Sequence, residues 1–398
     1  MSAQPLKVLA LDIEGGHGGS SRSLFNTIRH LDFNEVAVEV WCKREGAVRQ
    51  AYEDLGVTCR ITPGMPKVSA LPRFSRNAYV HLAFMREFMA ARGFRAELAE
   101  ASKDFDVLHF NHEALAWLGS WLRPRTEAAL VFHNRTMLWR SVFARMQIRA
   151  MDRAADRLVF ITENERDNVR RLGAKTAGDV VYNPVQIFTD APRPHEALAR
   201  EGRFKVCCLS NYAWNRGVDR LVEVAEALKS MGREDVVFAV AGDMALSSSL
   251  PGDLGETARR GGDLGDYALD RGVGDMFLFL GHVPDPERVL SACDVLVKPT
   301  RESNPWGRDI LEAMAMAKPV ISCGTYNAFV INSETGYLLK EYKAAEFADR
   351  ITELADDPKR VGAMGAKARE IVREKCHGPD KAAELTRIWK SAVNGRKN

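Results

Sequence analysis

Short apolar runs recur along the chain, and most are followed by a polar or Gly-rich turn and then by apolar positions at helical spacing. Each run is rich in Val, Ile, Leu or Phe, so we interpret it as a buried strand. A long helix is predicted at residues 81–101. Strands that alternate with helices are typical of parallel sheets covered on both faces, so the pattern predicts an α/β fold. The predicted strands occupy residues 7–13, 36–41, 106–112, 130–133, 156–162, 204–209, 236–243, 276–283, 294–298 and 320–323.

The stretch from residue 299 to residue 324 is the most informative part of the chain. It lies between two predicted strands and holds one predicted helix, in which Ile310 and Met314 share a face and which ends before Pro319. A strand–loop–helix–strand unit places its loop at the carboxyl end of the first strand, where ligands of parallel sheets bind. Gly307 lets the backbone approach a ligand, and the helix start behind it offers unpaired N–H groups to an anion.

This stretch resembles the donor-site signature of family 4 glycosyltransferases, which have the GT-B fold. In that signature an acidic residue, an aromatic–Gly pair and a second Glu precede Ala-Met-Ala and then Pro-Val-Ile. Trp306 and Gly307 fill the aromatic–Gly step, and Glu312 opens the run Glu-Ala-Met-Ala-Met-Ala-Lys-Pro-Val-Ile. Asn304 stands at the first acidic position; it can hydrogen-bond a sugar but carries no charge, so the donor sugar is left open. The resemblance implies that these four residues bind the donor.

The resemblance covers nearly the whole chain in order and implies two Rossmann-like, doubly wound parallel-sheet domains that face each other across a cleft. Residues 1–185 are expected to form the acceptor-binding domain and residues 186–375 the nucleotide-sugar-binding domain. Residues 376–398 are expected to form a helix that crosses back to the first domain. A chain of 398 residues has room for two such domains, and the Pro-containing segment at residues 185–202 is interpreted as the linker.

A Gly-rich turn follows the first predicted strand. Its Gly16-x-Gly18 pair lacks the third Gly of a dinucleotide-binding fingerprint, and no Gly-Lys-Ser/Thr of a phosphate-binding P-loop follows. In the family this turn faces the cleft near the donor phosphates and the acceptor, which implies donor contacts for Gly16, Gly18 and Gly19. His17 is a local addition to the turn; it contacts the acceptor in one interpretation and is incidental in the other.

Polar residues also end two further strands of the first half. The family places such residues in the cleft, and the resemblance implies acceptor contacts among His109, Asn111 and His112, of which one would suffice. His133 matches the family position whose imidazole contacts the transferred sugar at the reacting centre. The alternative for His133 is a core histidine at a strand end.

The loop at residues 210–221 occupies the place where the family holds the donor pyrophosphate with an Arg and a Lys. Asn211 stands at the Arg position and Arg216 at the Lys position. Cations are needed here because the leaving nucleoside diphosphate gains negative charge as the glycosidic bond breaks. We expect Arg308, directly after Gly307, to replace the missing cation.

These residues predict a retaining glycosyltransferase that uses a nucleotide-diphosphate sugar of the UDP or GDP type as substrate. The resemblance implies a front-face mechanism in which the leaving phosphate takes the proton of the acceptor hydroxyl, Glu312 holds the donor ribose, and Asn304 and His133 hold the sugar. No cofactor or divalent metal is expected. By analogy with the family, the acceptor is a glycan or lipid-linked glycan of a cell-surface polysaccharide or glycolipid.

Charge and cysteine content indicate where in the cell the protein is expected to work. The net charge of +3 is too small to indicate nucleic acid, and seven cysteines without a Cys-x-x-Cys pair suit reduced thiols in a cytoplasm. The start of the chain lacks the pattern of a secretion signal, and no apolar run is long enough to cross a bilayer. Basic residues gather at residues 60–95 and 123–149, which favours either a surface that meets anionic lipid or an anionic acceptor, or a solvated face.

Two other functions remain open from the sequence. One is a GT-B-fold epimerase or phosphorylase. An epimerase would need acid–base carboxylates that face the sugar. The other is a nucleotide-sugar-binding protein without transfer activity, which Asn211, Asn304 and Ala328 favour because the family prefers charge at these positions.

Overall fold

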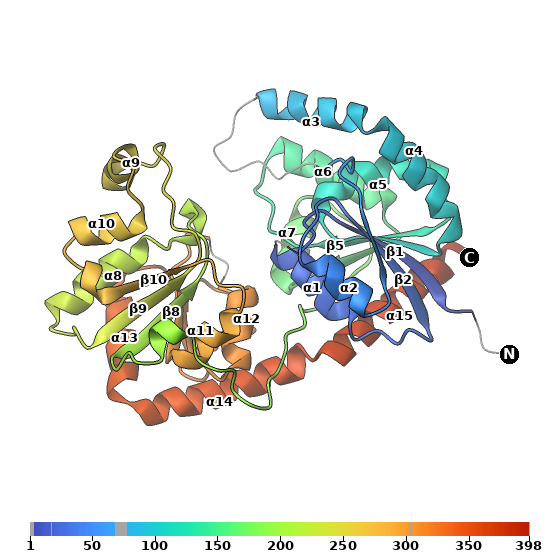
Figure 1. Cartoon of the computed structure of the whole chain (residues 1–398). Helices are drawn as coiled ribbons and strands as arrows, with labels where there is room; N and C mark the ends of the chain where they lie inside the picture. Colours follow the sequence, from blue (N-terminus) through green and yellow to red (C-terminus); the bar gives the residue numbers. More distant parts are fainter. Residues whose placement is uncertain (1–3, 17, 68–77, 303–304, 398) are drawn as a thin grey trace. The chain divides into compact units, whose positions relative to one another are not determined.

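The computed structural model describes residues 4–16, 18–67, 78–302 and 305–397. The chain divides into two compact units: unit 1 comprises residues 1–184 and 376–398, and unit 2 comprises residues 185–375 (Figure 1). Each unit has its own parallel sheet and its own hydrophobic core. The predicted fold class, two doubly wound α/β domains, is confirmed.

The sheet of unit 1 has seven strands in the order β3-β2-β1-β4-β5-β6-β7, and all of its pairings are parallel. The direction of strand addition reverses between β1 and β4. At such a reversal the two neighbouring crossovers leave on opposite faces, which opens a crevice at the carboxyl ends of the strands. The strands are β1 (Leu6–Asp12), β2 (Val36–Cys42), β3 (Thr58–Ile61), β4 (Val107–Phe110), β5 (Ala129–Asn134), β6 (Arg157–Phe160) and β7 (Gly178–Val180).

Helices cover both faces of this sheet (Figure 1). They are α1 (Gly19–Ile28), α2 (Val48–Asp54), α3 (Ala78–Ala90), α4 (Arg92–Ala101), α5 (Ala116–Leu122), α6 (Val142–Ala154), α7 (Glu163–Arg171) and α15 (Gly378–Lys397). Because side chains alternate along a strand, Val8 and Ala10 pack toward α1, α2 and α15, whereas Leu9 and Leu11 pack toward α4, α5 and α6. The last helix of the chain therefore belongs to the core of unit 1.

The sheet of unit 2 has six parallel strands in the order β10-β9-β8-β11-β12-β13, so its direction of strand addition reverses between β8 and β11. The strands are β8 (Phe204–Leu209), β9 (Val236–Ala241), β10 (Phe277–Gly281), β11 (Val295–Lys298), β12 (Val320–Cys323) and β13 (Gly336–Leu339). The helices are α8 (Arg220–Ser230), α9 (Gly252–Arg259), α10 (Leu264–Asp270), α11 (Pro286–Ala292), α12 (Arg308–Ala315), α13 (Ala344–Asp356) and α14 (Pro358–Lys375).

Most predicted strands lie where the apolar runs placed them, and those at residues 204–209 and 320–323 match to the residue. The helix predicted at residues 81–101 is two helices, α3 and α4, with a break at Ala91. Gly93 follows the break, and a glycine lowers the helix propensity of its neighbourhood. None of the helices in the described ranges is both long enough and apolar enough to cross a membrane.

Candidate active site

The reversal point of the unit 2 sheet lies between the carboxyl ends of β8 and β11, and two glycines bring the backbone close there. Gly217 has φ +70°, and a Cβ on it would lie 2.3 Å from the carbonyl oxygen of Pro299. Gly307 has φ +148° and is the N-cap of α12. Both backbone conformations strain any other residue, so glycine is required where the two loops meet the sheet.

A lysine that sequence reasoning missed holds the start of α12. Lys298, the last residue of β11, donates its Nζ to the carbonyl oxygen of Trp306 and to Asp309 Oδ1, each at 2.9 Å. A Cβ on Gly307 would lie 2.7 Å from both Lys298 Nζ and Asp309 Oδ1. Trp306, a predicted donor contact, is 4% exposed. The sequence does hold one sign of the Lys298 contact: a lysine ends an otherwise apolar predicted strand directly before the signature.

Two predicted donor contacts lie side by side on α12. Arg308 Nη2 pairs with Glu312 Oε1 at 2.6 Å, one turn further along, and both side chains are mostly buried. The residue expected to hold phosphate and the residue expected to hold the ribose therefore bond to each other in this structure. Each still lies at or within one turn of the helix start, where the unpaired backbone N–H groups attract anions.

Arg216 and Asn211 come from the loop after β8. Arg216 is exposed, and its Nη1 donates to Ser210 Oγ at 3.3 Å. Asn211 Oδ1 accepts from the backbone N–H of Asp243 at 2.9 Å, so the amide oxygen closes the turn after β9. The residue at the family's Arg position thus has a structural contact in place of a charge.

The charges of this region gather around the end of β8. Burial and then the charge of Asp309 raise the pKa of the Cys208 thiol, whereas the charges of Lys298 and Arg216 lower it, and the net pKa is about 12. All three charges are therefore close enough to act on one thiol. Lys298 ends β11, Arg216 lies in the loop after β8, and Asp309 lies in the first turn of α12, so two cations and one carboxylate belong to the elements that meet at the reversal point.

The two loops that carry these residues are also bonded to each other. Arg301 forms a two-armed ion pair with Asp219 and stacks on the ring of Trp214, with its guanidinium carbon 3.6 Å from the ring centre. Arg220 Nη1 donates to the carbonyl oxygens of Pro299 and Thr300 at 3.1 and 2.9 Å. These contacts fix the loop of Arg216 relative to the loop before α12, and no sequence pattern predicted them.

The Gly-rich turn of unit 1 lies at the corresponding reversal point. The buried carboxylate of Asp12, the last residue of β1, accepts from Gly15 N at 3.0 Å and from Ser21 Oγ at 2.5 Å. Gly16 N donates to the same hydroxyl at 2.6 Å. Gly18 is the N-cap of α1, and Gly19 is its first residue. The predicted glycines thus form the entry to α1, and Asp12, which sequence reasoning missed, anchors it.

His133 and His109 lie on the neighbouring strands β5 and β4 and are buried. Their rings meet edge to face with centres 5.5 Å apart, and His109 Nδ1 accepts from Trp389 Nε1 of α15 at 3.2 Å. Neither ring nitrogen of His133 has a hydrogen-bond partner among the residues that the structure describes. The sugar contact of His133 and the acceptor contact of His109 stay predictions.

Burial and then the charge of Arg135 lower the pKa of His109 to about 3 and that of His133 well below its usual range. Both imidazoles are therefore neutral at neutral pH. Asn111, at the end of β4, is also buried, and its amide bonds to Asp12, Ser20 and Arg135. Its predicted acceptor contact is untested.

Two predicted site residues, His17 and Asn304, lie outside the described residues, so their roles stay predictions. Within the described ranges, no three His, Cys, Asp or Glu side chains gather closely enough to hold a metal ion.

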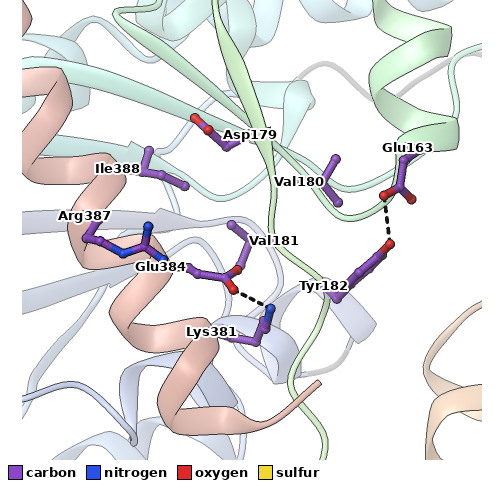
Figure 2. Close-up of a pocket in the computed structure, with 9 residues that line it drawn as sticks. All are labelled: Glu163, Asp179, Val180, Val181, Tyr182, Lys381, Glu384, Arg387 and Ile388. Carbon is purple, nitrogen blue, oxygen red and sulfur yellow. Dashed lines mark hydrogen bonds and ion pairs between the residues drawn. The ribbon is translucent and has the colours of Figure 1, made fainter. Parts of the chain in front are cut away.

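Unit 1 also has a pocket of about 360 Å³ beside the edge strand β7, and its lining includes none of the predicted site residues (Figure 2). Tyr182 donates to Glu163 at 2.8 Å, and Lys381 donates to Glu384 at 2.6 Å, so charged groups of the wall bond to one another (Figure 2). The lining residues are Glu163, Asp179, Val180, Val181, Tyr182, Lys381, Glu384, Arg387 and Ile388.

Sequence comparison relates the chain to characterised enzymes. It is 27% identical over 230 residues to alpha-D-kanosaminyltransferase of Streptomyces kanamyceticus, which covers 55% of this chain and 56% of that protein. It is 27% identical over 273 residues to a GDP-mannose-dependent alpha-(1-6)-phosphatidylinositol monomannoside mannosyltransferase of Mycobacterium tuberculosis, covering 64% and 66%. These two matches thus leave a third or more of each relative uncovered. D-inositol 3-phosphate glycosyltransferase 1 of Catenulispora acidiphila is 26% identical over 412 residues, 96% of this chain and 92% of that protein.

Solved structures share the fold at low sequence identity. HepE of Anabaena, solved in complex with UDP and glucose, superposes with a TM-score of 0.76 at 18% identity, over 97% of this chain and 99% of that one. Sucrose-phosphate synthase of Thermosynechococcus elongatus superposes with a TM-score of 0.71 at 17% identity, over 96% and 98%. At these identities the likeness establishes the GT-B-like fold alone.

Two family models account for most of the chain. The one described as Glycosyltransferase Family 4 matches residues 17–187, and the one described as Glycosyl transferases group 1 matches residues 192–371. They meet at the boundary between the two units, and the second contains the whole α12 region. With both halves matched in order on this fold, the chain belongs to glycosyltransferase family 4.

Proposed function

We propose that this enzyme transfers a glycosyl unit from a nucleotide-diphosphate sugar of the UDP or GDP type to an acceptor hydroxyl, with retention of configuration. The observation that carries the proposal is the set of cations at the reversal point of unit 2. Lys298, Arg216 and Arg308 lie by the start of α12 and the end of β8. A diphosphate placed there would meet both the helix N–H groups and these charges.

In this proposal Arg216 and Arg308 stabilise the leaving diphosphate. Arg308 exchanges its bond to Glu312 for one to phosphate, and Glu312 is then free to accept from the ribose hydroxyls. The bond from the anomeric carbon to the diphosphate oxygen breaks, and the acceptor oxygen bonds to the same face of that carbon. The acceptor proton passes to the departing diphosphate oxygen, so no protein base is needed. Trp306, Gly307 and Asn211 line the donor side.

Unit 2 is proposed to hold the donor and unit 1 the acceptor, with Gly16, Gly18 and Gly19 close to the transferring group and His133 at the sugar. The acceptor is proposed to be a glycan or lipid-linked glycan. The names of relatives support an anionic acceptor, because they include a phosphatidylinositol mannoside, inositol 3-phosphate and poly(ribitol-phosphate). Synthesis of a cell-surface polysaccharide or glycolipid on the cytoplasmic side is the setting we propose.

We propose that α6 contacts an anionic membrane. Its exposed side carries Arg145, Arg149 and Arg153, and its first turns expose Val142 (76%) and Met146 (49%). Arginines around exposed apolar side chains suit a helix that lies in the headgroup region of anionic lipid. This would bring a lipid-linked acceptor to unit 1.

The donor proposal is tested by calorimetry with UDP and GDP, followed by turnover of a panel of UDP- and GDP-sugars with and without acceptor. We expect Arg216→Met and Arg308→Met each to lower kcat/KM for the donor roughly 100-fold, because each removes a cation from the developing charge. Arg260→Met, which removes an exposed arginine paired with Asp270, serves as the matched control. Tight diphosphate binding with no hydrolysis or transfer from any donor would identify a binding protein instead.

The membrane proposal is tested by co-sedimentation with vesicles that contain or lack phosphatidylserine. Replacing Arg145 and Arg149 by Glu should abolish the phosphatidylserine-dependent binding, whereas the same double change at Arg170 and Arg171 of α7 should not. Wild-type binding that does not depend on lipid charge would discard this partner.

A further inference from the structure

Arg135 is a buried arginine that the predicted mechanism does not use. It follows β5 directly and is 8% exposed. Its Nε and Nη2 both donate to Asn111 Oδ1, at 3.0 and 2.5 Å, and its Nη1 donates to Asn183 Oδ1 at 2.8 Å. Its backbone N–H donates to Glu113 Oε2 at 3.0 Å. The planar guanidinium thus holds two asparagines at a fixed angle, which a lysine cannot reproduce.

Asn111 connects Arg135 to the turn before α1. Because its oxygen accepts two N–H groups of Arg135, its nitrogen must face the other way, and Nδ2 donates to Asp12 Oδ1 at 3.3 Å and to the carbonyl oxygen of Ser20 at 3.2 Å. Asp12 in turn holds Gly15 N and Ser21 Oγ. A continuous chain of bonds therefore runs from Arg135 to the entry of α1.

Two buried charges favour this series of hydrogen bonds. Asp12 is fully buried and Arg135 nearly so, and one asparagine amide lies between the carboxylate and the guanidinium. A buried charge is costly unless hydrogen bonds or an opposite charge stabilise it, so losing either partner removes part of what stabilises the other. With little exposed surface of its own, Arg135 is better suited to orient other residues than to bind substrate.

The network also reaches the segment in which the chain leaves unit 1 for unit 2. Asp12 ends β1, Asn111 follows β4 and Arg135 follows β5, so three neighbouring carboxyl ends of the sheet are joined. Asn183 follows β7 and precedes Pro184, the last residue of unit 1 before the chain enters unit 2. One guanidinium therefore links the turn before α1 to the segment that leaves the unit.

We propose that Arg135 is a positioning residue for the transfer reaction. Through Asn111 and Asp12 it holds Gly15, Gly16 and the start of α1 in the conformation that receives the transferring group, and through Asn183 it ties that turn to the exit segment of unit 1. The role in transfer rests on the proposed function. The linkage between Arg135 and the turn rests on the hydrogen bonds alone.

Hydrogen exchange of the full-length protein tests the linkage without any substrate. Gly15 N and Gly16 N donate to Asp12 and Ser21, so their exchange reports on the turn. In Arg135→Met we expect these amides to exchange at least about tenfold faster, with the amides of β8 and β9 unchanged. Arg135→Lys should recover part of this protection, and Asn183→Ala should give a smaller increase. The exposed Arg170→Met on α7 is the matched control.

Steady-state kinetics test the role in transfer. We expect Arg135→Lys to lower kcat/KM roughly tenfold or more, mainly through kcat, because the turn still forms but is less well positioned. Unchanged exchange of the Gly15 and Gly16 amides in Arg135→Met would overturn the proposal. So would a uniform rise in exchange across all of unit 1, which would mean that Arg135 only adds stability. If the wild-type chain transfers no sugar, the proposed function fails while the exchange measurement still tests the linkage.

Discussion

At the scale of single residues, several side chains predicted to touch substrate are bonded to one another. Arg308 pairs with Glu312, Asn211 closes the turn after β9, and Asn111 is held by Arg135. An unsatisfied buried polar group is costly, and these contacts satisfy the side chains when no substrate is bound. Substrate contacts of Arg308, Glu312 or Asn111 therefore require an exchange of partners.

His109 should make the stability of unit 1 depend on pH. Its pKa in the folded chain is about 3, whereas an unfolded histidine titrates near 6.5. As the pH falls below about 6.5, the histidine of the unfolded chain binds a proton but the histidine of the folded chain does not. The free energy of unfolding therefore falls by roughly 1.4 kcal/mol per pH unit. His133, with its pKa lowered in the same direction, adds to the effect.

Urea denaturation at about pH 7.5 and about pH 5.5 measures this dependence. His109→Gln is the informative variant, because a glutamine oxygen can still accept from Trp389 Nε1 but does not titrate. A variant whose pH dependence equals that of the wild type would show that His109 is not the responsible group.

At the scale of elements, the start of α12 is where backbone geometry and charge meet. The helix buries Ile310, Leu311 and Met314 against unit 2, which fixes its axis. Gly307 then turns the backbone so that Lys298 can reach Trp306 O and Asp309. The position of the anion-binding N–H groups therefore depends on a strand end, a glycine and a helix face together.

Gly307→Ala should disable this element. The new Cβ would lie 2.7 Å from Lys298 Nζ and Asp309 Oδ1, so these side-chain ends must shift, and a φ of +148° strains any residue with a side chain. We expect a loss of about 1–3 kcal/mol in stability and at least a tenfold lower kcat/KM for the donor. The control is Gly272→Ala, where φ is +71° but nothing lies within 4 Å of the new Cβ. Wild-type donor kinetics in Gly307→Ala would remove α12 from the donor site.

At the scale of the whole molecule, the two units are built differently along the chain. Unit 2 is one continuous segment, whereas unit 1 needs both ends of the chain. Trp389 of α15 is fully buried in the core of unit 1, beside His109 and Val131. The core of unit 1 is therefore complete only when residues 376–398 are in place.

Fragments of the chain test this division. Residues 185–375 should fold alone with one cooperative transition and bind UDP or GDP, because their sheet, core and proposed phosphate contacts are all present. Residues 1–184 should not fold stably without α15, since the apolar face around Trp389 would be exposed to water. Circular dichroism, calorimetry and addition of a peptide of residues 376–398 are the measurements. A stable 1–184 fragment would contradict the prediction.

By itself the sequence determined most of the strands in their order, the α/β class and the family. These follow from local patterns: apolar runs such as residues 204–209, the helical spacing of Ile310 and Met314, and the motif from Trp306 to Glu312. Each is carried by residues close together in the chain, so periodicity and spacing are enough to read it.

Only the tertiary structure decided which polar residues meet. Arg135 reaches Asn183, and Arg301 reaches Asp219, across 48 and 82 positions of sequence. Lys298 is recognised as a site residue only in the structure, where the backbone conformation at Gly307 places Trp306 O and Asp309 within hydrogen-bond distance of its Nζ. Such contacts depend on how the strand ends are ordered across each sheet, and hydrogen bonds between distant residues leave no periodic pattern in the chain.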